Sequence, residues 1–154
     1  MKFTVSDLKR ISLTVPLLNY RERTRWLATL RRRQPGFCEL VDWVGEDPRC
    51  ADACRFCTIF CAVALRQAED LAGNCLPTLP AMEIHEAASL IRRDQVSQVG
   101  RGACGYGQRL RRHALKGWSF DEDDTDWLCT MISAFLFLVE RSLTVPRRGH
   151  VHPT

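Results

Sequence analysis

Four cysteines in the middle of the chain follow one another at helical spacing. They are Cys50, Cys54, Cys57 and Cys61, in a C-x₃-C-x₂-C-x₃-C pattern. If this segment is α-helical, the four sulfurs fall within an arc of about 60° on one side of it. Thiolates bind soft metals such as zinc, Cu(I) and iron–sulfur clusters. The pattern therefore predicts either a metal site or a stripe of small apolar side chains against which another helix packs closely.

The rise of the helix limits how this stripe could bind a metal. It extends about 16 Å from Cys50 to Cys61, whereas every thiolate ligand of a zinc ion lies about 2.3 Å from it. At most two neighbouring cysteines can share one ion, so other parts of the chain must complete the ligand shell. The side chains that could complete it are Cys38, Cys75, Cys104, Cys129, His85 and His113. If a metal is bound, we expect copper or zinc.

The same segment resembles two families. Its C-x₃-C pairs are similar to those of the cysteine-lined four-helix bundle proteins that store copper, which implies Cu(I) inside a bundle. The resemblance covers only Cys50 to Cys61, and the other predicted helices carry one cysteine or none. Residues Cys50 to Cys57 also match the C-x₃-C-x-aromatic-C motif of radical S-adenosylmethionine enzymes, which implies an iron–sulfur cluster. That motif follows the first strand of a large α/β barrel, and no strand pattern precedes it here.

Charge alternates in blocks along the chain, although the net charge is only +4. Residues 1–34 carry a net +7, 35–91 a net −6, 92–118 a net +6 and 119–140 a net −6. Either helices of opposite charge pack side by side, or arginines form a patch that binds phosphates of an anion or a nucleic acid. The arginines that could form this patch are Arg31, Arg32, Arg33, Arg109, Arg111 and Arg112.

Helix start and stop signals in the sequence predict the helices that carry these residues. Asp47-Pro48 places a capping side chain before a proline at the first helical position, and Gly73-Asn74 provides a left-handed exit. The cysteine stripe should therefore lie on one regular helix from Pro48 to Ala72. Capping boxes at Asn19 and Ser119 begin two more helices. The helices predicted besides the stripe helix span residues 6–15, 19–34, 37–44, 80–99, 108–116 and 119–143.

These elements predict an all-α fold, a single-domain helical bundle of about five main helices. The chain has 154 residues, of which 45% are hydrophobic, enough for one domain with one core. The helical domain is expected over residues 1–145 and a flexible, basic tail over 146–154. The last helix, apolar around most of its circumference, is expected to be the most buried. The four tryptophans are also predicted to lie in the core: Trp26, Trp43, Trp118 and Trp127.

The function expected from these features is binding rather than catalysis. The chain shows no secretory signal, and its longest apolar runs are shorter than the roughly 20 residues that cross a bilayer. We therefore expect a cytoplasmic protein with reduced thiols. No pair of catalytic acid and base is recognisable, so we predict no enzyme. The first hypothesis is an adaptor or regulatory protein that contacts another protein or a second copy of itself. The alternatives are soft-metal binding by the cysteine stripe and nucleic-acid binding by the basic N-terminal helix.

Overall fold

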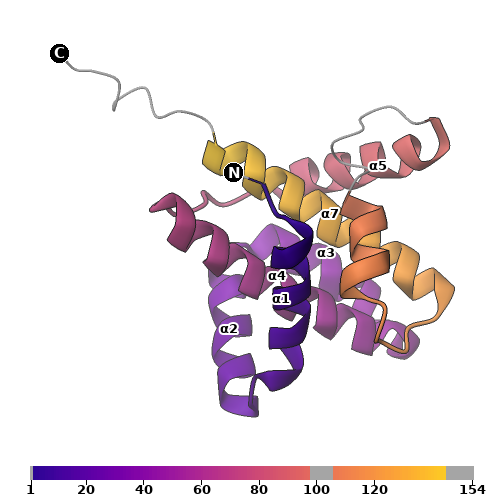
Figure 1. Ribbon diagram of the computed structural model, residues 1–154, viewed down its shortest axis with the longest axis horizontal. Coiled ribbons are helices and arrows are strands. Elements are labelled where there is room, and N and C mark those ends of the chain that lie inside the picture. Colours follow the sequence, from indigo (N-terminus) through magenta and orange to yellow (C-terminus); the bar gives the residue numbers. More distant parts are fainter. Residues whose placement is uncertain (1, 98–105, 145–154) are drawn as a thin grey trace.

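The protein is a helical bundle in the part of the chain that the computed structural model describes, residues 2–97 and 106–144. Within these ranges no residue forms a strand (Figure 1). The elements, in chain order, are α1 (Val5–Thr14), the 3₁₀ turn η1 (Val15–Leu17), α2 (Tyr20–Arg33), α3 (Pro35–Gly45), the 3₁₀ turn η2 (Pro48–Cys50), α4 (Ala51–Ala72), α5 (Ala81–Ser97), the π-helical η3 (Leu110–Ala114) and α7 (Glu122–Thr144). The predicted all-α bundle is confirmed. The predicted tail, 146–154, lies outside the described residues.

Helices α4 and α7 form the centre of the bundle. They pack along each other, and α1, α2 and α3 contact α4 while α5 contacts α7 (Figure 1). The apolar α7 is deeply buried, with Ile132 and Phe135 fully enclosed, but it is not the most buried helix, contrary to the prediction. Helix α4 is buried more extensively, because its small side chains let neighbours approach from several sides. No helix in the described ranges combines the length and the hydropathy that a membrane span requires.

Local capping explains where several helices begin. At the start of α2, the Asn19 side chain accepts a hydrogen bond from the Glu22 N–H (2.9 Å), and the Glu22 carboxylate accepts one from the Asn19 N–H (3.2 Å). This predicted capping box is confirmed. The first helix, predicted from residue 6, begins at Val5 and is capped by Thr4, because Thr4 and Asp7 form the same reciprocal pair of bonds (3.1 and 2.8 Å).

Two other boundaries also differ from the prediction. Helix α7 starts after Asp121 rather than Ser119, because the Asp121 carboxylate accepts the Asp124 N–H at 2.7 Å. Pro35 and Gly36, predicted to end a helix, also form the first turn of α3. A proline fits there because the first residues of a helix have no intrahelical partner for their N–H groups.

Gly36 lies where the first turn of α3 meets the start of α5. A Cβ atom at this position would be 2.8 Å from the backbone nitrogen of Ala81 and 3.1 Å from the carbonyl oxygen of Leu79. Gly36→Ala must therefore push the two backbones apart. We expect it to lower the free energy of unfolding by about 1–3 kcal/mol, measured by urea denaturation.

The control for this substitution is Gly107→Ala. Gly107 is also helical, but nothing lies within 4 Å of a Cβ added there. Alanine favours the helix over glycine by up to about 1 kcal/mol, so this variant should be as stable as the wild type or more stable. Equal effects of the two substitutions would argue against the close approach of α3 and α5.

Candidate functional site

The cysteine stripe lies on α4, but its helix begins later than predicted. Residues Pro48–Cys50 form a 3₁₀ turn, in which the Asp47 carboxylate accepts the Arg49 N–H at 3.0 Å, and Cys50 is the N-cap of α4. The α-helix itself therefore carries Cys54, Cys57 and Cys61. Cys57 and Cys61 are fully buried, Cys54 is buried and Cys50 is half-exposed.

The buried part of the stripe lies beside α3. A Cβ on Gly45 would be 3.4 Å from the Cys54 sulfur, so the end of α3 approaches α4 closely at this cysteine. Burial raises the pKa of the Cys61 thiol, and the neighbouring thiols of Cys57 and of Cys38 on α3 raise it further. Small side chains on both helices thus allow the two backbones to pack tightly.

Burial keeps these thiols protonated. It raises the pKa of Cys38 to about 11 and that of Cys54 to about 12, and it also raises the pKa of Cys61. A thiol is a nucleophile or a metal ligand only as the thiolate. A metal ion bound here would have to displace these protons.

The additional metal ligands suggested by the sequence lie apart from one another. Cys75 is exposed beyond the end of α4, and His85 and His113 are exposed on α5 and η3. Cys129 is buried on α7, where burial raises its pKa to about 11, and Cys104 lies outside the described residues. Among the residues that the structure describes, no three His, Cys, Asp or Glu side chains gather where they could hold a metal ion.

Three of the six candidate phosphate-binding arginines are paired with acids. Arg31 binds Asp42 through two hydrogen bonds of 2.5 and 2.9 Å, and Arg33 binds Glu69. Arg111 binds two acids of α7. These ion pairs join basic segments to acidic neighbours. This is the first of the two arrangements predicted from the charge blocks, in which helices of opposite charge pack side by side. The other three of the six, Arg32, Arg109 and Arg112, are exposed and have no ion pair in the described part of the chain.

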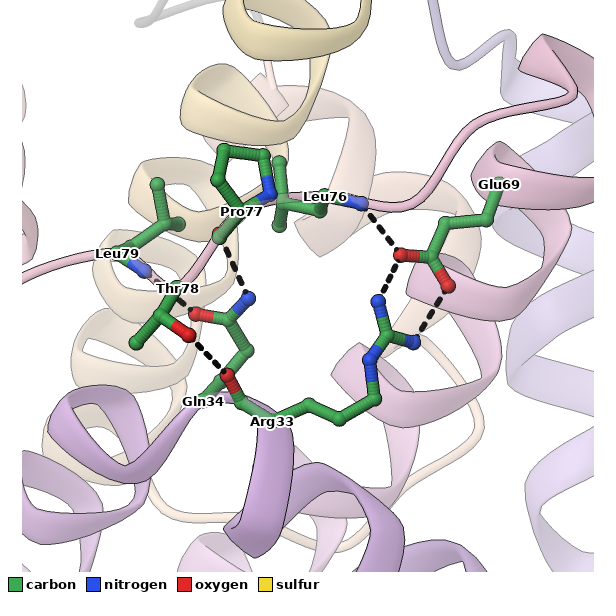
Figure 2. Close-up of polar contacts among 7 residues, drawn as sticks. All are labelled: Arg33, Gln34, Glu69, Leu76, Pro77, Thr78 and Leu79. Atoms are coloured by element: carbon green, nitrogen blue, oxygen red, sulfur yellow. Dashed lines mark hydrogen bonds and ion pairs between the residues drawn. The ribbon is translucent and has the colours of Figure 1, made fainter.

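The loop after α4 is held in place by polar contacts that the sequence did not predict (Figure 2). The Arg33 guanidinium forms an ion pair with the Glu69 carboxylate through two hydrogen bonds. The same carboxylate also accepts a hydrogen bond from the Leu76 N–H at 2.6 Å. The fully buried Gln34 side chain donates to the Pro77 carbonyl (3.0 Å) and accepts the Leu79 N–H (2.9 Å). These bonds fix Arg33 on the wall of a pocket between α2 and α4.

This α2–α4 pocket has a volume of about 260 Å³. Its floor is apolar and its rim carries cations. The residues that define it here are Arg25, Trp26, Leu30, Arg33, Leu65 and Arg66. The Arg66 guanidinium carbon lies 5.4 Å from the centre of the Trp26 ring. Because these residues belong to two helices, no spacing in the sequence predicts the pocket.

A second surface, which we call the Trp43 face, is the outer side of α3 formed by Glu39, Asp42, Trp43 and Glu46. All four side chains are exposed, and Trp43 is 74% exposed. The prediction that Trp43 lies in the core is therefore wrong. Hollows of about 430 and 210 Å³ lie on either side of Trp43. Trp127 and Met131 contribute to the smaller one.

Comparisons with known proteins identify no relative. No protein-family model, curated protein or solved structure matches this chain.

Proposed function

We propose that the protein is a non-enzymatic adaptor or regulatory protein, and that the Trp43 face is where it contacts another protein. The observation that carries this proposal is the 74% exposure of Trp43 between two hollows. A tryptophan left in water forgoes a large gain from burial, and tryptophan is enriched at the energetic centres of protein interfaces. The buried, protonated thiols support a binding role, because they are not activated nucleophiles.

The charge on the outer side of α3 favours a basic partner, although Arg92 of α5 lines the smaller hollow. Glu39 and Glu46 have no ion pair within the described residues, whereas Asp42 is already bound to Arg31. Glu39 and Glu46 lie seven residues apart, two turns along the same face. A partner helix with an apolar side chain over Trp43 and a lysine or arginine on each side would match this pattern. Trp127 and Met131 provide an apolar surface next to Trp43 for a second side chain.

Site-specific photo-crosslinking tests this proposal. A photoreactive phenylalanine analogue placed at residue 43 of the full chain in cells should crosslink to a distinct protein, identified by mass spectrometry. The matched control is the same probe at Leu17, which is 80% exposed on η1. A proposal based on exposure alone would predict the same crosslinks from both positions. The proposal fails if residue 43 yields no crosslink, or only those that residue 17 yields.

The affinity of the purified partner then tests the chemistry of the surface. Trp43→Ala should raise the Kd about 30-fold, the effect of losing about 2 kcal/mol at an interface centre. Glu39→Lys and Glu46→Lys should each weaken binding and reduce its dependence on salt, because each replaces one of the two attractions with a repulsion. Leu17→Ala should leave the Kd unchanged. Binding that Trp43→Ala does not weaken would contradict the proposal.

A further inference from the structure

We infer that the α2–α4 pocket binds a small organic anion in which a phosphate or carboxylate is attached to a flat apolar group. This inference goes beyond the protein contact proposed above, because the pocket shares no lining residue with the hollows beside Trp43. It rests on the unpaired cations of the rim, the apolar floor and the size of the cavity.

The rim holds positive charge that the protein itself does not neutralise. Arg25 and Arg66 are exposed side chains of α2 and α4 and have no ion pair within the described residues. The third guanidinium, that of Arg33, is bound by Glu69, which leaves it fixed in place but largely neutralised. Two unpaired guanidinium groups at one cavity repel each other, and an anion between them removes that repulsion. The planar guanidinium also matches the two oxygens of a carboxylate or phosphate.

The rest of the pocket suits an aromatic ring. Leu30 and Leu65, almost fully buried, form its floor, and Trp26 offers a half-buried indole at the side. Arg66 already lies over this indole at cation–π distance, which places a cation beside the apolar surface. A volume of about 260 Å³ is below the about 300–1,000 Å³ of sites for drug-sized ligands. A single ring with one anionic group fits these dimensions.

The test measures binding of simple probes to the full chain by NMR of the tryptophan indole N–H groups. The Trp26 signal is identified as the one missing from Trp26→Phe. Phenyl phosphate or benzoate should shift this signal in a saturable manner, and the tighter of the two shows whether phosphate or carboxylate is preferred. Inorganic phosphate and benzyl alcohol, which lack the ring and the charge respectively, should bind about tenfold more weakly or worse.

Substitutions on the rim show whether the two arginines hold the anion. The double variant Arg25→Gln/Arg66→Gln should weaken binding about tenfold or more. Both side chains are exposed and the Arg66–Trp26 contact contributes only about 0.5–1 kcal/mol, so its unfolding temperature should stay within a few degrees of that of the wild type. The control is Arg23→Gln, an exposed arginine of α2 that does not line the pocket; its affinity should equal that of the wild type.

Any one of four outcomes would overturn the inference. One is that neither aromatic anion gives a saturable shift of the Trp26 signal. Another is that benzyl alcohol binds as tightly as benzoate, or that the double variant binds as tightly as the wild type. The last is that a single-stranded oligonucleotide displaces the aromatic anion with an affinity that falls steeply with salt, which would assign the pocket to a nucleic acid instead.

Discussion

Replacing Gln34 with alanine is expected to lower the free energy of unfolding by about 2–4 kcal/mol. The Gln34 side chain is fully buried and forms hydrogen bonds with the Pro77 carbonyl at 3.0 Å and the Leu79 N–H at 2.9 Å. Alanine leaves the Leu79 N–H without a partner in the interior, which costs about 1–3 kcal/mol, and the loss of the part-buried bond to the Pro77 carbonyl adds about 1 kcal/mol. Urea denaturation followed by circular dichroism measures the change.

Gln67→Ala is the matched control. The Gln67 amide is half-buried and donates one hydrogen bond to Asp7 at 3.1 Å, close to solvent. Water replaces that partner when the side chain is removed, so the loss should stay below about 1 kcal/mol. If Gln34→Ala were no more harmful than Gln67→Ala, the loop after α4 would not depend on the buried amide.

The variant Gln34→Glu tests the same contacts through pH. It has nearly the same shape, but as a carboxylate it presents an oxygen instead of an N–H to the Pro77 carbonyl. Burial should raise its pKa in the folded state above that in the unfolded chain. A raised folded-state pKa makes the variant most stable below the unfolded value, and the stability falls as the pH rises through the folded value. The difference in unfolding free energy between this variant and the wild type should therefore grow from pH 5 to pH 8.

Gln34 also shows what the sequence could not reveal. The capping box at Asn19 was predictable, because both partners lie within four residues and their types suffice. The partners of Gln34 lie 43 and 45 residues away, and no local pattern indicates them. The same limit applies to the α2–α4 pocket, whose walls come from two helices. Local signals therefore predicted the helices and the fold class. The Gln34 contacts and the α2–α4 pocket depend on residues far apart in the sequence, which local signals do not reveal.

The cysteine stripe is an intermediate case. Its helical spacing correctly predicted that Cys54, Cys57 and Cys61 lie on one side of α4. Spacing alone cannot tell a metal site from a tight helix contact, because both need small side chains on one face. A Cβ added to Gly45 would lie only 3.4 Å from the Cys54 sulfur, and this proximity and the burial of the thiols are features of the helix contact. For Trp43 the prediction was wrong. Its residue type suggested the core, but its position on α3 places it on the outer side of that helix.

Truncating Phe135 should have the largest effect of all the substitutions considered. Its ring is fully buried in α7, and its centre lies 4.6 Å from that of Phe37 on α3. Phe135→Ala removes this contact and leaves a cavity at the junction of the two helices. We expect a loss of about 3–5 kcal/mol in unfolding free energy, measured by urea denaturation. Phe137→Ala, a half-buried neighbour on the same helix, should cost clearly less.

A double-mutant cycle shows whether the two rings stabilise each other. Phe37→Ala should also be costly, and the double variant should lose less than the sum of the single variants, with a coupling of about 0.5–1.5 kcal/mol. The two rings link the inner side of α3 to α7, and the outer side of α3 carries Trp43. If the costs were additive, the rings would not hold α3 in place, and the position of the Trp43 face would depend on other contacts of that helix.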